Sequence, residues 1–452
     1  MINPSFFKKS LGYTTKQLPQ ILKSLSVLNG FIYVKNNKQP IIAILPSNYF
    51  LNTSTGIQLF TRNDKLEYTP NNGQNIFEFV QTNNLNFHSN NNEFNGGYMG
   101  FVSYDYAAQN QINCSVKLQP SLYIGQYDTF LKFENDQLFL YSYEENHNKI
   151  TDLIEKTLDK NIISVNNAFR LKAPIRARWD KHQYQAAFNS IQNYIKAGDC
   201  YQINLTQEFS AECSGNLIDI SHDLWNLTEA PYSGFLSIDG LQILSCSPEL
   251  FIDFNAGKQL VTRPIKGTMP RYVDEKLDQE SKQKLKNSQK DQAENLMIVD
   301  LLRNDLSVYA EIGSVKTPKL FEIESFNQVH HMVSEITATL KADINPFKVL
   351  IDALPGGSIT GAPKIRAMQI IDELEGAPRG AYCGSLGYFN YDGTGSWNIL
   401  IRSVQKYQEQ LSIWAGGGIT IASDCDAEYQ ECFDKVSAML DLINTWYKPE
   451  SD

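Results

Sequence analysis

The sequence lacks paired cysteines, long apolar runs and an excess of positive charge. Its seven cysteines are scattered and form no C-x-x-C pair, which argues against a disulfide framework and a cysteine zinc site and indicates reduced thiols. No run reaches the length of a membrane-spanning helix, and Met1 to Leu25 contain no continuous apolar stretch typical of a signal peptide. The net charge of -10 gives no overall positive field for nucleic acid or anionic lipid. We therefore predict a cytoplasmic protein with no nucleic-acid partner and no membrane partner.

The remaining composition is that of a soluble globular protein with a sizeable core. The chain has 452 residues, of which 42% are hydrophobic and 20% charged, and it shows no repeat. We divide it into an N-terminal scaffold or regulatory subdomain, residues 1–172, and a catalytic region, residues 173–452. Because the net charge is negative, an anionic substrate would need local positive side chains or backbone N–H groups.

The N-terminal subdomain alternates short apolar runs with polar turns, a pattern typical of strands. The asparagine-rich stretch 83–95 is expected to form a surface loop. The glycine-punctuated stretch 96–105 predicts a strand that another backbone approaches closely. Further strands are predicted at residues 31–34, 41–45, 121–124 and 137–143.

The catalytic region opens with a well-marked helix. Asp180 and Gln183 form a capping-box pattern at its start, and Gly198 ends it. The apolar face of this helix consists of Tyr184, Phe188, Ile191 and Ile195. Strands are expected after it at residues 200–206, 242–246 and 250–254.

Lys266 stands in a constrained segment that follows the last of these strands. Pro264 restricts the backbone on one side of Lys266, and Gly267 permits a close turn on the other. A lysine held in such a place in a partly dry site would have a lowered pKa, and its neutral amine would be a nucleophile or a base. The alternative is a surface lysine at a strand end.

Carboxylates on two predicted helices are candidate ligands for a divalent cation. Glu294 shares a face of the helix 292–306 with apolar residues, so we expect it to face the core, where a carboxylate needs a partner or a metal. Glu428 and Glu431 lie beside Lys435 on a helix predicted at 426–446. Hard oxygen ligands of this kind suit Mg²⁺. The alternatives are a helix N-terminal glutamate and a surface Glu–Lys pair.

Two glycine-rich segments are candidate anion-binding loops. Residues 355–364 precede a helix but depart from the Walker A pattern, because Ala362 and Pro363 follow Gly361. Residues 416–420 contain three consecutive glycines beside a strand, for which a plain tight turn is the alternative. Arg402, on a strand predicted at 398–404, and His331 add positive or titratable groups.

Together these motifs resemble those of the chorismate-utilising enzymes, and most closely those of the component I subunits of aminodeoxychorismate synthases. The resemblance covers most of residues 180–445 in order, and the N-terminal part matches weakly, mainly through 96–105. The matching segments are 198–205, 247–251, 262–268, 294–305, 331–334, 355–364, 401–403, 416–420 and 428–435.

Two positions discriminate within the family. Lys266 stands where anthranilate synthases carry alanine, and Gln202 stands where the water-using isochorismate and salicylate synthases place a lysine base. The resemblance therefore implies amination of chorismate at C4 to 4-amino-4-deoxychorismate, for p-aminobenzoate and folate synthesis. Ammonia would come from a separate glutamine amidotransferase subunit.

The alternatives are an anthranilate synthase component I and a non-catalytic anion-binding protein. The leucine-leucine-glutamate-serine motif with which anthranilate synthases bind tryptophan is absent.

The resemblance also implies a fold and a set of site residues. The fold would be α+β, with an antiparallel β-sandwich core and helices packed outside, as in anthranilate synthase component I. The catalytic residues would be Lys266 as nucleophile, Glu249 as acid, Gln202 and His331. Mg²⁺ would be held by Glu294, Glu428 and Glu431. The chorismate-binding residues would be Thr360, Gly361, Tyr382, Arg402, Gly416, Gly417, Gly418 and Lys435.

Overall fold

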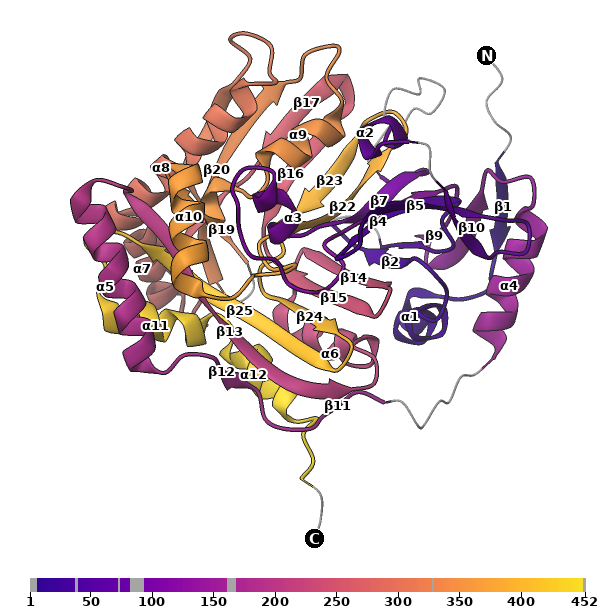
Figure 1. Cartoon of the computed structure of the whole chain (residues 1–452), viewed down its shortest axis with the longest axis horizontal. Coiled ribbons are helices and arrows are strands. Elements are labelled where there is room, and N and C mark those ends of the chain that lie inside the picture. Colours follow the sequence, from indigo (N-terminus) through magenta and orange to yellow (C-terminus); the bar gives the residue numbers. More distant parts are fainter. Residues whose placement is uncertain are drawn as a thin grey trace.

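Two large antiparallel sheets pack face to face, with helices on their outer faces (Figure 1), which confirms the predicted fold class. The computed structural model describes residues 6–36, 40–71, 74–81, 93–160, 168–326 and 329–449. Most of the predicted loop at 83–95 lies outside these residues. No helix of the described residues is long and apolar enough to cross a membrane.

The first sheet combines strands from both ends of the chain. β12 (Arg176–Ala177) and β21 (Gly361–Ala362) also pair with its strand β13. The remaining strands follow the order β1 (Phe7–Ser10), β10 (Gln137–Ser142), β9 (Thr129–Glu134), β3 (Ile41–Ala43), β2 (Phe31–Val34), β14 (Tyr232–Ile238), β15 (Leu241–Ser247), β24 (Ser403–Tyr407), β25 (Gln410–Ile419), β13 (Gln202–Ser214) and β11 (Arg170–Leu171).

The second sheet is built in the same way. β19 (Lys316–Ser325) pairs with its strand β20 outside the main order. That order is β18 (Ile265–Pro270), β20 (Val329–Thr339), β17 (Gln259–Thr262), β16 (Leu250–Asn255), β23 (Gly395–Asn398), β22 (Ser385–Asn390), β7 (Gly97–Val102), β8 (Leu122–Tyr127), β4 (Asn48–Thr53), β5 (Gly56–Arg62) and β6 (Tyr68–Asn71).

Both sheets run across the predicted boundary at residue 172. β2 pairs with β14 in the first sheet, and β7 pairs with β22 in the second. Between the sheets, a buried cluster contains side chains of both, such as Leu236 of β14 and Leu386 of β22. The division into 1–172 and 173–452 stays a prediction.

The helices pack against the outer faces of the sheets, where they bury two further apolar clusters. They are α1 (Leu18–Leu25), α2 (Ile76–Phe79), α3 (Tyr104–Gln109), α4 (His147–Asp159), α5 (Lys181–Ala197), α6 (Ile218–Thr228), α7 (Glu275–Lys286), α8 (Gln289–Ser307), α9 (Pro346–Ala353), α10 (Lys364–Glu375), α11 (Cys425–Asp434) and α12 (Ser437–Asn444).

Local sequence signals placed several of these elements correctly. The capping box of α5 is present, with Asp180 accepting from the Gln183 backbone N–H, and Gly198 ends the helix at a φ of 83°. The predicted close approach at β7 is also confirmed, because a Cβ on Gly100 would lie 1.9 Å from the carbonyl oxygen of Tyr123. Only a residue without a side chain fits there.

Two predicted elements were wrong in extent. The single helix expected at 426–446 is two helices, α11 and α12, and at Val436 between them φ is -130° and ψ is -3°. The strand expected at 398–404 is also interrupted. Arg402 lies in the connection between β23 and β24 at a φ of 48°.

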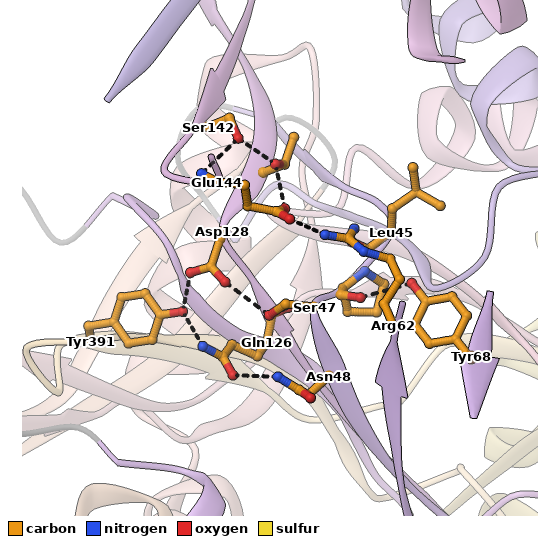
Figure 2. Close-up of polar contacts among 12 residues, drawn as sticks. Leu45, Ser47, Asn48, Arg62, Tyr68, Gln126, Asp128, Ser142, Glu144 and Tyr391 are labelled. Carbon is orange, nitrogen blue, oxygen red and sulfur yellow. Dashed lines mark hydrogen bonds and ion pairs between the residues drawn. The ribbon is translucent and has the colours of Figure 1, made fainter. Parts of the chain in front are cut away.

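A polar network joins strands of the N-terminal region to the loop between β22 and β23 (Figure 2). Tyr391 of that loop donates a hydrogen bond to Asp128 at 2.5 Å and accepts one from Gln126 at 2.9 Å. Nearby, Arg62 forms a buried ion pair with Glu144. The two Tyr391 contacts join the N-terminal region to the rest of the second sheet across more than 200 residues of sequence.

Candidate active site

A cavity of about 580 Å³ is lined by residues of both sheets and of α8 and α11. It brings together side chains that are far apart in the sequence, among them a lysine, an arginine, a histidine and several carboxylates. Of the site residues predicted from the sequence, those that line it are Glu249, Lys266, Glu294, His331, Tyr382, Arg402, Gly416, Gly418, Glu428, Glu431 and Lys435.

Lys266 enters the cavity from an irregular point of β18. The pairing with β20 runs from Ile265 opposite Val333 to Thr268 opposite His331, so Lys266 and Gly267 together face one partner residue. Such a β-bulge redirects the side chain that it carries. Gly267 adopts a φ of 83°, and a Cβ there would lie 2.8 Å from the carboxyl carbon of Asp291. Glycine is therefore required beside the lysine for both backbone and space.

The side chain of Lys266 is partly buried in the cavity. Its Nζ donates a hydrogen bond to the carbonyl oxygen of Ser358, at 3.4 Å. Burial lowers the pKa of Lys266, and the nearby positive charge of Lys435 lowers it further, whereas Glu294, Glu249 and Glu431 oppose this shift. A lowered pKa increases the fraction of neutral amine, which is the form that attacks a carbon centre.

Glu249 provides a carboxyl group whose pKa is raised, whereas that of Lys266 is lowered. It lies between β15 and β16 and is only 6% exposed. Burial raises its pKa to about 7, although the Lys266 charge and the backbone N–H of Ile265 favour the ionised form. A carboxyl group that stays protonated near neutral pH can donate a proton to a leaving group.

His331 and Arg402 contribute a neutral ring and a positive charge. The Nδ1 atom of His331 shares a hydrogen bond with the hydroxyl of Thr268 at 2.8 Å. Burial lowers the pKa of His331 to about 4, with a further contribution from Arg402, so the ring is neutral at physiological pH. No side chain of the described residues accepts a hydrogen bond from the Arg402 guanidinium, which is therefore available to an anionic ligand.

Three carboxylates converge from α8 and α11. A Cβ on Gly417 of β25 would lie 2.8 Å from Glu428 Oε2 and 2.9 Å from Glu431 Oε1, so both side chains reach the same point above this strand. The prediction that Glu294 faces the core was wrong. The buried stripe of α8 is rotated away from it and consists of Asn295, Ile298, Val299, Leu302 and Leu306. Glu294 borders this stripe and lines the cavity.

Lysines partly compensate the charge of these carboxylates. Lys290 Nζ lies 3.9 Å from Glu294 and 3.9 Å from Glu428, and Lys435 Nζ lies 2.6 Å from Glu431. Burial raises the pKa of Glu294 and of Glu428, and in each case the negative charge of Glu431 adds to the rise. Burial also acts on Glu431, but the charge and hydrogen bond of Lys435 outweigh it and lower its pKa.

These carboxylates suit Mg²⁺ in type but do not form a complete metal site. Within the described residues, no group of three or more His, Cys, Asp and Glu side chains is arranged to hold a metal ion. Mg²⁺ commonly takes only one or two protein carboxylates and completes its shell with water and substrate oxygens. Two carboxylates that converge above Gly417, with a third facing the same cavity, fit this pattern.

The two glycine-rich segments differ from the predicted loops. Gly416, Gly417 and Gly418 belong to β25 and pair with β13, so they form a strand. Here the missing side chains provide space, since a Cβ on Gly418 would lie 2.4 Å from Gln202 Nε2. Thr360 and Gly361 do not line the cavity. The Thr360 hydroxyl donates to Gly356, and Gly361 pairs with Ile203.

Gln202 lies behind the cavity wall. It is fully buried, it contacts Gly418, and neither atom of its amide has a hydrogen-bond partner among the described residues. Gly417 does not line the cavity either, and its missing side chain leaves room for Glu428 and Glu431. Four of the predicted residues therefore lie behind the cavity lining and support the side chains that form it. They are Gln202, Thr360, Gly361 and Gly417.

Several cavity residues were not found from the sequence. Trp414 stacks on Tyr382 with ring centroids 6.0 Å apart, and an isolated tryptophan in a strand carries no signal of this role. Lys290 could have been found from its i,i+4 spacing to Glu294. Further lining residues that were missed are Asn204, Pro248, Ile265, Thr268, Asp291, Val329, Ser358, Ile359, Ile401, Ala415, Asp434 and Val436.

Comparisons with known proteins agree with this arrangement. A family model described as chorismate binding enzyme matches residues 31–441. The chain is 43% identical to aminodeoxychorismate synthase component 1 of Klebsiella aerogenes over 78% of each chain, and 42% identical to that of Escherichia coli strain K12 over 78% of each. The structure of anthranilate synthase component I from Streptococcus pneumoniae superposes with a TM-score of 0.73 at 25% identity, over 88% of this chain and 91% of that one. The chain belongs to the chorismate binding enzyme family, together with the aminodeoxychorismate synthase component 1 proteins.

Proposed function

We propose that this chain aminates chorismate with ammonia and forms 4-amino-4-deoxychorismate, a step towards p-aminobenzoate and folate. The observation that carries this proposal is the presence in one cavity of an amine with a lowered pKa, Lys266, and a carboxyl group with a raised pKa, Glu249. The names of the relatives at 42–43% identity support the same activity.

With Lys266 and Glu249, the replacement of the C4 hydroxyl by an amino group would take place in two steps. The neutral amine of Lys266 forms a bond to C2 of the ring, the ring double bonds shift towards C4, and the C4–O bond breaks. Glu249 transfers its proton to the departing hydroxyl, which leaves as water. Ammonia then forms a bond to C4, the double bonds shift back, and the C2–N bond to Lys266 breaks, so the amine is released. The proton that ammonia loses restores Glu249.

The other cavity residues bind and orient the substrate. Arg402, whose guanidinium has no hydrogen-bond acceptor within the described part of the chain, would pair with a chorismate carboxylate. Tyr382 and the neutral His331 would pack against the ring. Glu294 and Glu431, with Glu428 beside them, would hold Mg²⁺, which when bound supplies positive charge to a second substrate carboxylate.

Ammonia would come from a second protein. The relatives' names contain the words component 1, which imply a second component. We propose that this partner is a glutamine amidotransferase and that the two proteins act together in the cytoplasm.

The first prediction concerns the product and the role of Lys266. The chain should convert chorismate, Mg²⁺ and ammonium salt into 4-amino-4-deoxychorismate, and Lys266→Ala should lower this rate by about a hundredfold or more, because the nucleophile is lost. Chromatography of the quenched reaction identifies the product. Lys319→Ala, on β19 and outside the cavity, is the control and should keep full activity. Anthranilate as the main product of the parent chain would refute the proposal.

The second prediction concerns the metal. Glu294→Gln and Glu431→Gln should each weaken Mg²⁺ binding to the resting protein, measured by titration calorimetry, and should raise the Mg²⁺ concentration required for turnover. Asp300→Asn is the matched control on α8, because Asp300 is exposed and pairs with Arg303. Circular dichroism should show an intact fold in all three variants. Mg²⁺ affinity equal to that of the parent in both glutamine variants would remove these carboxylates from the metal site.

The third prediction concerns pH. Since the pKa of Glu249 is raised to about 7, its carboxyl group is protonated below this value and ionised above it. If Glu249 is the proton donor, kcat should fall as the pH rises through about 7. The assay should hold the concentration of free ammonia constant, because ammonium also titrates. Glu249→Gln should be much slower and should lack this fall, whereas a fall that persists in the variant would assign it to another group.

A further inference from the structure

Arg379 is a fully buried charge that does not itself line the cavity. It follows α10 and is 1% exposed. Its Nη1 donates a hydrogen bond to the carbonyl oxygen of Ile359 at 2.9 Å, and its Nη2 donates one to the carbonyl oxygen of Asn204 at 2.8 Å. Ile359 and Asn204 are both cavity residues. The guanidinium thus joins two segments of the cavity wall from behind.

Glu375 balances this charge and extends the network. Arg379 Nε and Nη2 donate to its two carboxylate oxygens at 2.9 and 2.7 Å. Glu375 Oε1 also accepts from the backbone N–H and the hydroxyl of Thr206, at 2.9 and 2.6 Å. The planar guanidinium donates its hydrogen bonds in fixed directions, so its contacts with Glu375 and with the two carbonyl oxygens hold these groups in one arrangement.

The wall that Arg379 holds carries the hydrogen-bond acceptor of Lys266. Ser358, whose carbonyl oxygen receives the amine, directly precedes Ile359. Asn204 holds the same short segment, because its Nδ2 donates to the Ile359 carbonyl at 3.1 Å and its backbone N–H donates to the Thr360 carbonyl at 2.8 Å. Movement of this segment would move the Ser358 carbonyl and with it the amine.

The anion-binding groups of the cavity are attached elsewhere, although the Arg379 guanidinium also lies over the Tyr382 ring, 5.8 Å from its centroid. Arg402 lies between β23 and β24, and Gly416 lies in β25. Neither is a hydrogen-bond partner of the Arg379 guanidinium among the described residues, so displacement of segment 357–360 would leave these anion-binding groups in place. Displacement of segment 357–360 should therefore affect the chemical step more than the binding of the substrate carboxylates.

We propose that Arg379, paired with Glu375, is a positioning residue that fixes the Ser358 carbonyl and thereby orients the amine of Lys266 for attack. The inference rests on the proposed function in so far as Lys266 is the nucleophile. The inference adds a role for a buried ion pair outside the cavity. This pair would act on Lys266 through the backbone of Ser358 and Ile359.

The test replaces both charges together with Arg379→Met/Glu375→Gln. Removal of one charge alone would leave the other buried and unpaired, whereas the double replacement leaves neither, and glutamine can still accept from Thr206. The matched control is Arg62→Met/Glu144→Gln, which removes a buried ion pair whose residues do not line the cavity. Arg379→Lys is a second variant that keeps the charge but loses the planar fork, in case the double variant does not fold.

Three quantities are compared with those of the parent. The kcat with ammonium should fall by about tenfold to a hundredfold, since small misplacement of a reacting group has an effect of this size. The KM for chorismate should change by less than about twofold. Amide hydrogen exchange of the peptide containing Ile359 and Thr360 should become faster in the resting protein. The Arg62/Glu144 control should keep its kcat, and Arg379→Lys should show an intermediate loss.

Each remaining outcome contradicts the proposal. Faster exchange with an unchanged kcat would mean that the segment does not position the reacting group. A lower kcat with unchanged hydrogen exchange would mean that the Arg379–Glu375 pair does not affect Lys266 through the segment that contains Ser358. Equal losses in the control would make the ion pair merely structural. Hydrogen exchange is measured without chorismate, so it reports on Arg379 even if Lys266→Ala shows that the proposed function is wrong.

Discussion

The burial of an amine and a carboxyl group in one cavity is the constraint on which the proposed chemistry depends. Burial disfavours both charged forms, so it lowers the pKa of Lys266 and raises that of Glu249. The two shifts are useful together, because one group must attack as a neutral amine and the other must donate a proton. The shift of Lys266 depends on the β-bulge at Lys266 and Gly267, which directs the lysine into the cavity.

The sequence predicted what depends on local chemistry. The capping box of Asp180 and Gln183, with Gly198 at the far end, defines α5 because these residues satisfy backbone groups of their own helix. Lys266 and Glu249 were found through resemblance to a family, because the proline and glycine neighbours of the lysine left a surface position open as the alternative to a partly dry site. The α+β sandwich followed from the same resemblance and from the many short apolar runs.

What depends on distant partners could not be predicted. Gly416 to Gly418 was taken for a loop, but pairing with β13 makes it a strand, and the space it leaves is filled by side chains of α11 and by Gln202. The face of α8 that is buried is set by the sheet below it, so Glu294 lies at its edge. Arg379 carried no sequence signal, since its role depends on carbonyl oxygens that only the tertiary fold brings to it.

The central claim is that Lys266 forms a covalent bond to the substrate. Mass spectrometry of the chain quenched after mixing with chorismate and Mg²⁺, in the absence of ammonia, tests it most directly. Without ammonia the second displacement cannot occur, so the adduct should accumulate on the peptide that contains Lys266 and should be absent from Lys266→Ala. No adduct on this peptide, together with near-normal activity of Lys266→Ala, would contradict the covalent mechanism and leave the lysine as an electrostatic anchor.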